Sequence, residues 1–366
     1  MNKLQQTINR IGQLPAAAAE RAQARLDSLT KPPGSLGRLE KIARQLVAIT
    51  GNEQPSMRRK SIIVMAGDHG VTAEGVSAYP QAVTAQMVLN FLRGGAAINV
   101  LARHAGARLV VVDIGVNAEF PPNTTPADTS GNVEFLRRKV APGTRNFARE
   151  AAMTRDQAVA ALTAGIEVAE AEIARGAELI ATGDMGIGNT AASSAIVAAI
   201  TGRPVAEVTG RGTGVNDAGL AKKIEVISNA LELHGFTPNA SRSTLDALDL
   251  LAKVGGLEIA GLAGVVLGAA VARRPVVLDG FISGAAALIA AGLAPGVTQF
   301  CFAAHRSVEA GHRVTLETLG LEPVLDLDLR LGEGTGAALV MHLIEASAKF
   351  YNEMATFTEA GVAEKH

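Results

Sequence analysis

The sequence predicts an α/β fold in which a mostly parallel sheet of about six strands is flanked by helices on both faces. Short apolar runs typical of buried strands alternate with longer stretches whose apolar residues recur at helical spacing. Several of the predicted strands end in Asp next to Gly. Glycine is abundant, at 39 residues, which favours helices packed closely on a sheet.

The composition excludes several classes of protein. The formal net charge of −1 argues against nucleic acid or an anionic membrane as the main partner. The single cysteine, Cys301, excludes an intramolecular disulfide and argues against a metal–thiolate cluster. The N-terminus is polar, and no apolar run reaches the ~18–20 residues that span a bilayer. We therefore expect a cytoplasmic protein without a membrane span.

The N-terminal 50 residues are predicted to be helical. Residues 15–30 and 36–49 have the composition or spacing of helices, and a Pro-Pro-Gly sequence separates them. Lys31 and Arg38 flank this break. They are either solvated turn charges or a pair that reaches an anion.

Six apolar runs predict the strands, at residues 61–66, 108–115, 178–183, 275–279, 299–303 and 323–329. Helices are predicted between and after them, at 83–105 with an interruption at two glycines, 154–175, 191–200, 251–271 and 337 to beyond 349. Residues 117–150 lack periodicity. They form either a long loop or a loop with a short edge strand, and such loops are usually functional or mobile.

The polar strand ends should meet at one edge of the sheet, because parallel strands share a direction. The residues concerned are Asp68, Asp113, Asp184 and Asp279. Glu333 lies between Gly332 and Gly334, in the predicted connection between the last strand and the helix that follows it. Ligands of open α/β sheets bind at that edge. Glu333 is either an acid or base held against a ligand, or a solvated residue of a tight turn.

A second glycine loop, at 183–190, predicts a phosphate site at a helix N-terminus. It combines backbone N–H groups with an amide and a hydroxyl, from Gly186, Gly188, Asn189 and Thr190. The alternative is a plain strand-to-helix turn. Lys223 and Arg211 are candidate charge partners for the same phosphate, although each, taken alone, is more often solvated.

Other common sites are not supported. The loop at 183–190 lacks the Gly-Lys-Ser/Thr ending of a Walker motif and is not a clean dinucleotide fingerprint. The pairs Asp68-His69 and His305-Arg306 suggest metal ligands, but no second group stands at ligand spacing. No Gly-x-Ser-x-Gly elbow of a serine hydrolase is present. We expect neither a metal nor a cofactor.

Seven motifs occur in an order that resembles one family. They are KPPGSLGRLE at 31–40, GDHGV at 67–71, EGV at 74–76, GDMGIGNT at 183–190, KVGG at 253–256, LDGF at 278–281 and RLGEGTG at 330–336. Together they look like the nicotinate-nucleotide:dimethylbenzimidazole phosphoribosyltransferases, the enzymes of cobalamin nucleotide-loop assembly. The resemblance runs from about residue 20 to 350. No single motif is specific, but the combination is.

The resemblance implies an activity and an architecture. The enzyme would move the phosphoribosyl group of nicotinate mononucleotide to 5,6-dimethylbenzimidazole, giving α-ribazole 5′-phosphate and nicotinate with inversion at the anomeric carbon. The sheet would be Rossmann-like within a large catalytic domain at 51–339. Residues 1–50 and 340–366 would form a small helical domain. A homodimer is implied, with each active site borrowing from the partner's small domain.

The resemblance also assigns roles to residues. Glu333 matches the general base, and Asp184 is placed to stabilise positive charge at the sugar. Gly332 would join the loop at 183–190 and Lys223 in holding ribose and phosphate. An apolar pocket for the base would be lined by Tyr79, Met87 and Leu331. The sequence departs from some relatives, which carry Glu at the position of Asp184 and Ser at that of Tyr79, so the role of Asp184 and the preferred base stay open.

Two other functions remain possible from the sequence. A nicotinamide-dependent oxidoreductase would share the sheet type but would need a redox step. A nucleotide-binding module without turnover would share the glycine loops, although a Glu between glycines argues weakly against it. Release of nicotinate would distinguish the transferase from both.

Overall fold

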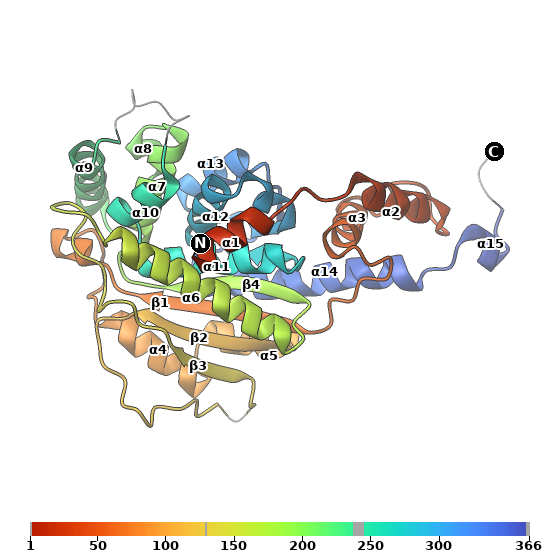
Figure 1. Ribbon diagram of the computed structural model, residues 1–366, viewed down its shortest axis with the longest axis horizontal. Helices are drawn as coiled ribbons and strands as arrows, with labels where there is room; N and C mark the ends of the chain where they lie inside the picture. The colour runs from red at the N-terminus through yellow and green to blue at the C-terminus, as the bar shows by residue number, and fades with distance from the viewer. Residues whose placement is uncertain (1, 129, 237–244, 364–366) are drawn as a thin grey trace.

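A computed structural model describes residues 2–128, 130–236 and 245–363 (Figure 1). It contains a seven-stranded sheet in which all neighbouring strands are parallel, with the order β3-β2-β1-β4-β5-β6-β7. The strands are β1 (Lys60–Gly67), β2 (Ala107–Gly115), β3 (Val133–Arg137), β4 (Leu179–Met185), β5 (Val276–Leu278), β6 (Cys301–His305) and β7 (Pro323–Leu325). The predicted α/β class and Rossmann-like sheet are confirmed. The strand additional to the six predicted is β3, which lies at the edge of the sheet within residues 117–150, where the sequence allowed a loop with a short edge strand.

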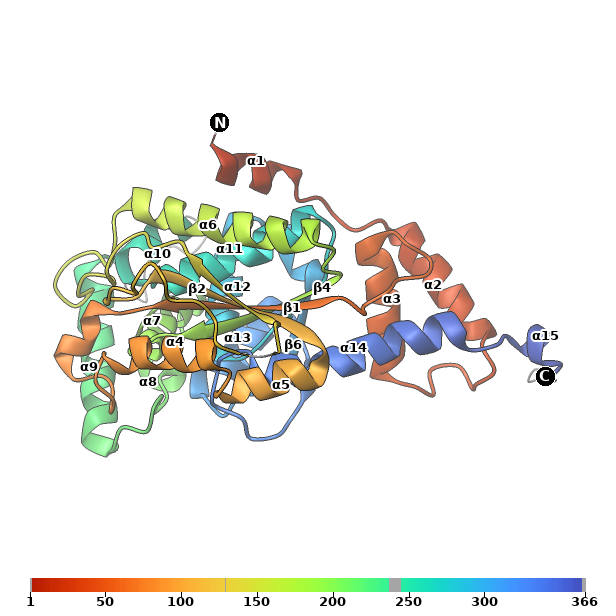
Figure 2. The ribbon, with the colours of Figure 1, turned by 90° about the horizontal axis from the view of Figure 1, so that it is seen from below.

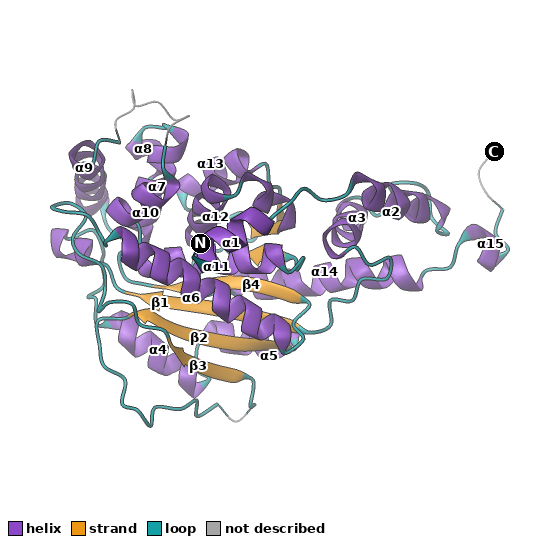
Figure 3. Ribbon diagram, in the orientation of Figure 1, coloured by secondary structure: helices purple, strands orange, loops and turns teal. Residues whose placement is uncertain are grey.

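The helices surround the strands and extend beyond one end of the sheet (Figure 3). They are α1 (Lys3–Arg10), α2 (Ala16–Ser28), α3 (Arg38–Thr50), α4 (Val83–Arg93), α5 (Ala97–Ala105), α6 (Arg155–Ala174), α7 (Asn189–Thr201), α8 (Val205–Val208), α9 (Asp217–Leu233), α10 (Ala247–Val254), α11 (Leu257–Val271), α12 (Phe281–Leu293), α13 (Ala310–Leu319), α14 (Thr335–Glu353) and α15 (Phe357–Ala360). The described 3₁₀ helices are η1 (Gly70–Glu74) and η3 (Pro295–Phe300). None of these helices is long and apolar enough to cross a membrane.

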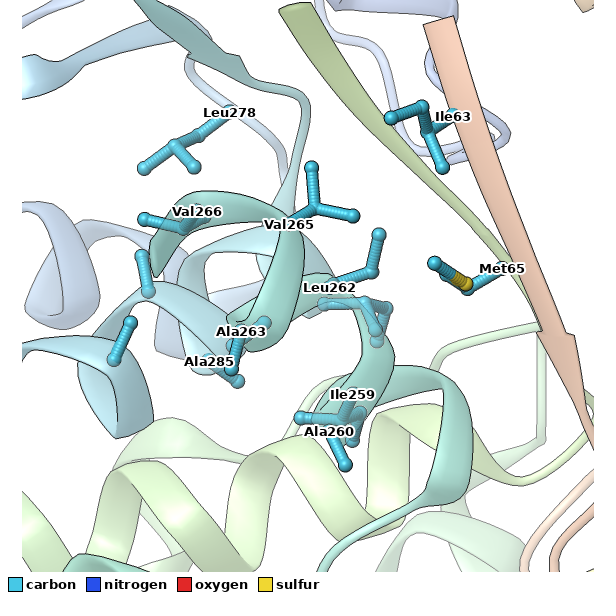
Figure 4. Packing of buried hydrophobic residues seen from close by; sticks show 14 of the residues in the cluster. Ile63, Met65, Ile259, Ala260, Leu262, Ala263, Val265, Val266, Leu278 and Ala285 are labelled. Carbon is cyan, nitrogen blue, oxygen red and sulfur yellow. The ribbon is translucent and has the colours of Figure 1, made fainter. Parts of the chain in front are cut away.

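The sheet is the middle of three layers. Helices α6 and α11 lie on one side of it, and α4, α5 and α14 lie on the other (Figure 2). All eight residues of β1 are consequently buried, as expected for a parallel strand covered on both faces. The apolar core includes residues of α11 packed against β1, β5 and α12 (Figure 4).

Helices α6 and α11 touch backbone to backbone. A methyl group added at Gly165 would lie 1.9 Å from the carbonyl oxygen of Gly261, and one added at Gly264 would lie 2.0 Å from that of Leu162. Glycine is therefore required at both positions. Close packing of this kind is what the small-residue composition of 251–271 predicts.

Helices α2 and α3 pack with the C-terminal part of α14 at one end of the molecule (Figure 1). Their apolar contacts form a separate cluster that includes Leu26, Val47 and Tyr351. Helix α1 does not join this group, because it packs on α6 and α11, where Lys3 pairs with Glu170 (Figure 2). The division into two domains stays a prediction. Helix α14 connects this group to the sheet.

Several boundaries differ from those that the sequence predicts; the strand expected at 299–303, for example, is β6 at Cys301–His305. The helix expected at 251–271 is two helices, α10 and α11, with Gly255 and Gly256 between them. The last strand ends at Leu325 and not at Leu329, because residues 326–331 leave the sheet as an irregular segment. That segment leads directly into the turn that carries Glu333.

Candidate active site

Buried carboxyl groups gather at the carboxyl edge of the sheet. Asp113 and Asp184 belong to the ends of β2 and β4, while Asp68 and Asp279 directly follow β1 and β5. All four are at least 93% buried. The parallel topology therefore places the four strand ends of the sequence analysis at one edge of the sheet.

Glu333 reaches this edge on a strained turn. Its backbone has φ +64°, and its neighbours Gly332 and Gly334 have φ +81° and +92°. Three consecutive residues with left-handed backbone conformation are rare, and a residue other than glycine in this conformation costs about 1–3 kcal/mol. Gly183 of β4 makes room for the turn, since a methyl group there would lie 2.4 Å from the carbonyl oxygen of Glu333. This strained turn places the side chain of Glu333 where it is only 5% exposed.

The surroundings of Glu333 suit a general base. Burial raises the pKa of its carboxyl to about 7; a hydrogen bond from the backbone of Ile98 opposes the rise, and the charge of Asp279 adds to it. Among the described residues, Oε2 has no hydrogen-bond partner. A carboxylate with a pKa near neutrality and a free oxygen can accept a proton from a ligand.

Asp184 lies beside the same turn. Its Oδ2 accepts a hydrogen bond of 2.9 Å from Asn189 Nδ2, while Oδ1 has no partner in the described part of the chain. A methyl group on Gly332 would lie 3.3 Å from both carboxyl oxygens. Burial raises the pKa of Asp184 well above its ordinary value, and Asp279, Glu258 and Glu333 add to the rise. A cationic group at this corner would relieve that repulsion.

The glycine loop after β4 leads into α7. Gly188 is the N-cap of the helix, with φ +98°, and Asn189 and Thr190 form its first turn. A side chain at Gly186 would collide with the backbone, because its methyl group would lie 2.4 Å from the carbonyl oxygen of Gly67. Three N–H groups of this turn already have acceptors: that of Ile187 donates to Thr84 Oγ1, and those of Asn189 and Ala191 donate to carbonyl oxygens of the loop itself. The phosphate site at this helix N-terminus stays a prediction.

Lys223 of α9 supports this loop. Its Nζ donates hydrogen bonds to Thr190 Oγ1 at 2.7 Å and to the carbonyl oxygen of Gly210 at 3.2 Å. Burial lowers its pKa to about 8, although the charge of Glu309 opposes the decrease. Arg211, the other candidate charge partner, pairs with Asp217 and with the carbonyl oxygen of Val215.

The three residues predicted for the base pocket differ in exposure. Tyr79 and Leu331 are 54% and 57% exposed, whereas Met87 on α4 is half-buried. Their shared role stays a prediction.

In the helical group at the other end of the molecule, Lys31 is buried and pairs with Glu40 at 2.9 Å, so it is not the solvated charge that the sequence allowed.

The described residues contain no group of three or more His, Cys, Asp or Glu side chains that could hold a metal ion. His69, one of the suspected ligands, is fully buried, and its Nε2 lies 2.7 Å from Glu258 Oε1. Burial lowers the pKa of His69, but Glu258 and Asp68 more than offset this and the pKa is raised.

Comparison with known proteins places this site in a family. A family model described as phosphoribosyltransferase matches residues 11–362. The nicotinate-nucleotide–dimethylbenzimidazole phosphoribosyltransferase of Chloroflexus aggregans is 59% identical over 365 residues, which cover 100% of this chain and 99% of the relative. That of Roseiflexus sp. is 60% identical with the same coverage. The chain belongs to the nicotinate-nucleotide–dimethylbenzimidazole phosphoribosyltransferase family.

The fold agrees with this assignment. The crystal structure of the corresponding enzyme from Thermus thermophilus is 48% identical, covers 95% of this chain and 99% of its own, and superposes with a TM-score of 0.87. The family resemblance read from seven motifs is thereby confirmed along nearly the whole chain.

One buried group of this phosphoribosyltransferase was not predicted. Glu258 opens α11 and contributes to the charge at Asp184. It is the only charged residue of Leu257–Val271, and this isolation was the available signal in the sequence. Asp279 was predicted only as a polar strand end, and its contacts with the turn of Glu333 arise from tertiary structure.

Proposed function

We propose that this enzyme transfers the 5-phosphoribosyl group of nicotinate mononucleotide to 5,6-dimethylbenzimidazole. The products are α-ribazole 5′-phosphate and nicotinate, and the reaction belongs to cobalamin biosynthesis. Membership of the family supports the assignment of these two substrates. The observation that carries the mechanism is Glu333, a buried carboxyl with one free oxygen at the carboxyl edge of the sheet.

One nitrogen of the benzimidazole attacks the anomeric carbon of the ribose. The bond from that carbon to the pyridinium nitrogen breaks, and its electron pair neutralises the nicotinate ring. The second ring nitrogen of the attacking base loses its proton to Glu333. Attack on the face opposite the leaving group inverts the anomeric configuration. Proton transfer of this kind typically contributes about 10²–10⁴-fold to the rate.

The remaining site residues bind and stabilise the nucleotide in this proposal. Asp184 faces the positive charge that develops on the sugar, because its free Oδ1 lies beside the turn of Glu333. The loop from Gly186 to Thr190, with Lys223 and Gly332, binds ribose and phosphate. Tyr79, Met87 and Leu331 line the pocket for the base.

The family resemblance also supports a homodimer and a cytoplasmic location. The partner's small helical group would complete each active site. The activity would then depend on the dimer but not on the location.

The test is a product analysis. The enzyme is incubated with nicotinate mononucleotide and 5,6-dimethylbenzimidazole, and the mixture is separated by chromatography and identified by mass spectrometry. We expect nicotinate and α-ribazole 5′-phosphate in equal amounts, and no nicotinate when the benzimidazole is left out. No ribosyl product with several benzimidazoles would contradict the proposal.

A further inference from the structure

Helix α14 begins without a capping side chain of its own. Its N-cap is Gly334, which has none. A helix start leaves backbone N–H groups that need acceptors when they are buried. Asp279, from the end of β5, supplies them: its Oδ2 accepts a hydrogen bond from Gly334 N at 3.1 Å, and its Oδ1 accepts one from Ala337 N at 3.0 Å. The backbone of Gly336 is a third donor to the same carboxyl.

These bonds fix the peptide that follows Glu333. The carbonyl oxygen of Glu333 lies against Gly183, where a methyl group would approach within 2.4 Å, and the N–H of the same peptide bond points to Asp279. The peptide is therefore held from both sides. The left-handed backbone of Glu333 persists because these contacts determine it.

Asp279 is itself enclosed by the protein. It is 99% buried, and His305 Nε2 lies 3.9 Å from its Oδ1. His305 fits because Gly336 has no side chain: a methyl group there would lie 2.1 Å from His305 Cδ2. Burial raises the pKa of Asp279, while His305 and the three backbone N–H groups oppose the rise.

We propose that Asp279 is a positioning residue for this enzyme: as an N-cap borrowed from another strand, it sets both the direction and the charge environment of Glu333. The proposal rests on the proposed role of Glu333 as the base. The titratable groups that face this corner are Asp184 of β4, Asp279 after β5, His305 of β6 and Glu258 of α11. Strand β1 contributes the apolar Ile62, and α5 contributes the backbone of Ile98.

The test is Asp279→Asn, which keeps the shape of the side chain but removes its charge and one acceptor. We expect kcat to fall about 10- to 100-fold, because a base displaced by a fraction of an ångström loses its alignment. The Kd for nicotinate mononucleotide should stay within about threefold, since the nucleotide is held mainly elsewhere. We expect the acidic limb of the kcat profile near pH 7 for the unaltered enzyme and at lower pH for this variant, because burial still raises the pKa of Glu333 but the added contribution from the charge of Asp279 is gone.

A double variant separates positioning from direct catalysis. If Asp279 acts through Glu333, adding Asp279→Asn to Glu333→Gln should lower kcat by no more than about twofold further. An unmoved acidic limb, or a loss in the double variant close to the product of the two single losses, would overturn the proposal. Full activity of Glu333→Gln alone would instead reject the proposed base.

Asp246→Asn is the matched control. Asp246 caps α10 through Leu248 N and Asp249 N, and its helix starts beside Gly292, at the end of α12 remote from the carboxyl edge. We expect this variant to keep kcat and the acidic limb.

If circular dichroism shows that Asp279→Asn does not fold, Asp279→Thr, which retains one capping oxygen, takes its place. Loss of folded protein in both variants would make Asp279 a folding residue and would also overturn the proposal.

Discussion

Burial destabilises the ionised form of Glu333 and thereby brings its pKa into the range of a general base. Moving a carboxylate out of water disfavours its charged form, and this is the largest cause of its raised pKa. At neutral pH the Glu333 carboxyl is then protonated in part of the molecules and ionised in the others. A base in that condition can take a proton from a bound azole and return it to solvent without a large energetic barrier at either step.

Lys223 gives a second prediction at the scale of single residues. In the proposed phosphate site the charged form of Lys223 binds the phosphate, and the pKa of about 8 means that this form is lost as the pH rises above 8. We expect the Kd for nicotinate mononucleotide to increase above about pH 8. Lys223→Met should raise the Kd by about tenfold or more at pH 7. Isothermal titration calorimetry from pH 6.5 to 9 measures both effects.

The neighbouring Lys222 provides the control, because its side chain is 49% exposed and pairs with Glu225 on the same helix. Lys222→Met should leave the Kd unchanged. Equal Kd values for Lys223→Met and the unaltered enzyme would place the phosphate away from α9.

The sequence indicated Glu333, Asp184 and the glycine loop because each stands at a strand-to-helix junction with glycines around it. Local sequence carries that signal. It carries no signal for the pairing of His69 with Glu258, which lie 189 positions apart. Nor does it show that Lys31 is buried, because charged residues in a Pro-Gly turn are usually solvated.

At the scale of elements, the contact between α6 and α11 depends on glycines. Gly264→Ala would place a methyl group 2.0 Å from the carbonyl oxygen of Leu162, so the helices must separate. We expect a loss of about 1–3 kcal/mol in the free energy of unfolding. Denaturant unfolding followed by circular dichroism measures it.

Gly12→Ala is the control, since no atom lies within 4 Å of the added methyl group and its φ is not left-handed. This variant should unfold like the unaltered protein. A stability of Gly264→Ala equal to that of Gly12→Ala would mean that the two helices are packed less closely than described.

Element types were predictable here and element ends were not. The strands at 61–66, 108–115 and 178–183 were found because a buried parallel strand is a short, continuous apolar run. The run at 323–329 was also predicted as a strand although Asp326 and Asp328 interrupt it; the strand ends at Leu325, and Asp328 has a left-handed backbone with φ +54°. Strand β3 has a partly buried edge position and no continuous apolar run, and its pairing with β2 decides its structure.

At the scale of the whole molecule, α14 connects the candidate active site to the helical group at the other end. Its first turn is held by Asp279, and its C-terminal part packs in the cluster that includes Tyr351. At 19 residues it is about 28 Å long. The turn that carries Glu333 and the helical group are therefore joined by one continuous helix.

The proposed homodimer gives the prediction at this scale. We expect light scattering to report twice the chain mass of 37.6 kDa. Because each active site would borrow from its partner, specific activity should fall on dilution below the dissociation constant of the dimer. A monomer with constant specific activity at all concentrations would contradict a shared active site.

The general base is the centre of this account, and the kcat of Glu333→Gln tests it most directly. The substitution keeps the size of the side chain and removes its ability to accept the proton, so kcat should fall about 10²–10⁴-fold at pH 8. The Kd for nicotinate mononucleotide and the folded content should be unchanged, and Glu322→Gln, at an exposed position, should keep full activity. A kcat of Glu333→Gln within twofold of the unaltered enzyme would show that the proton of the attacking base leaves by another route.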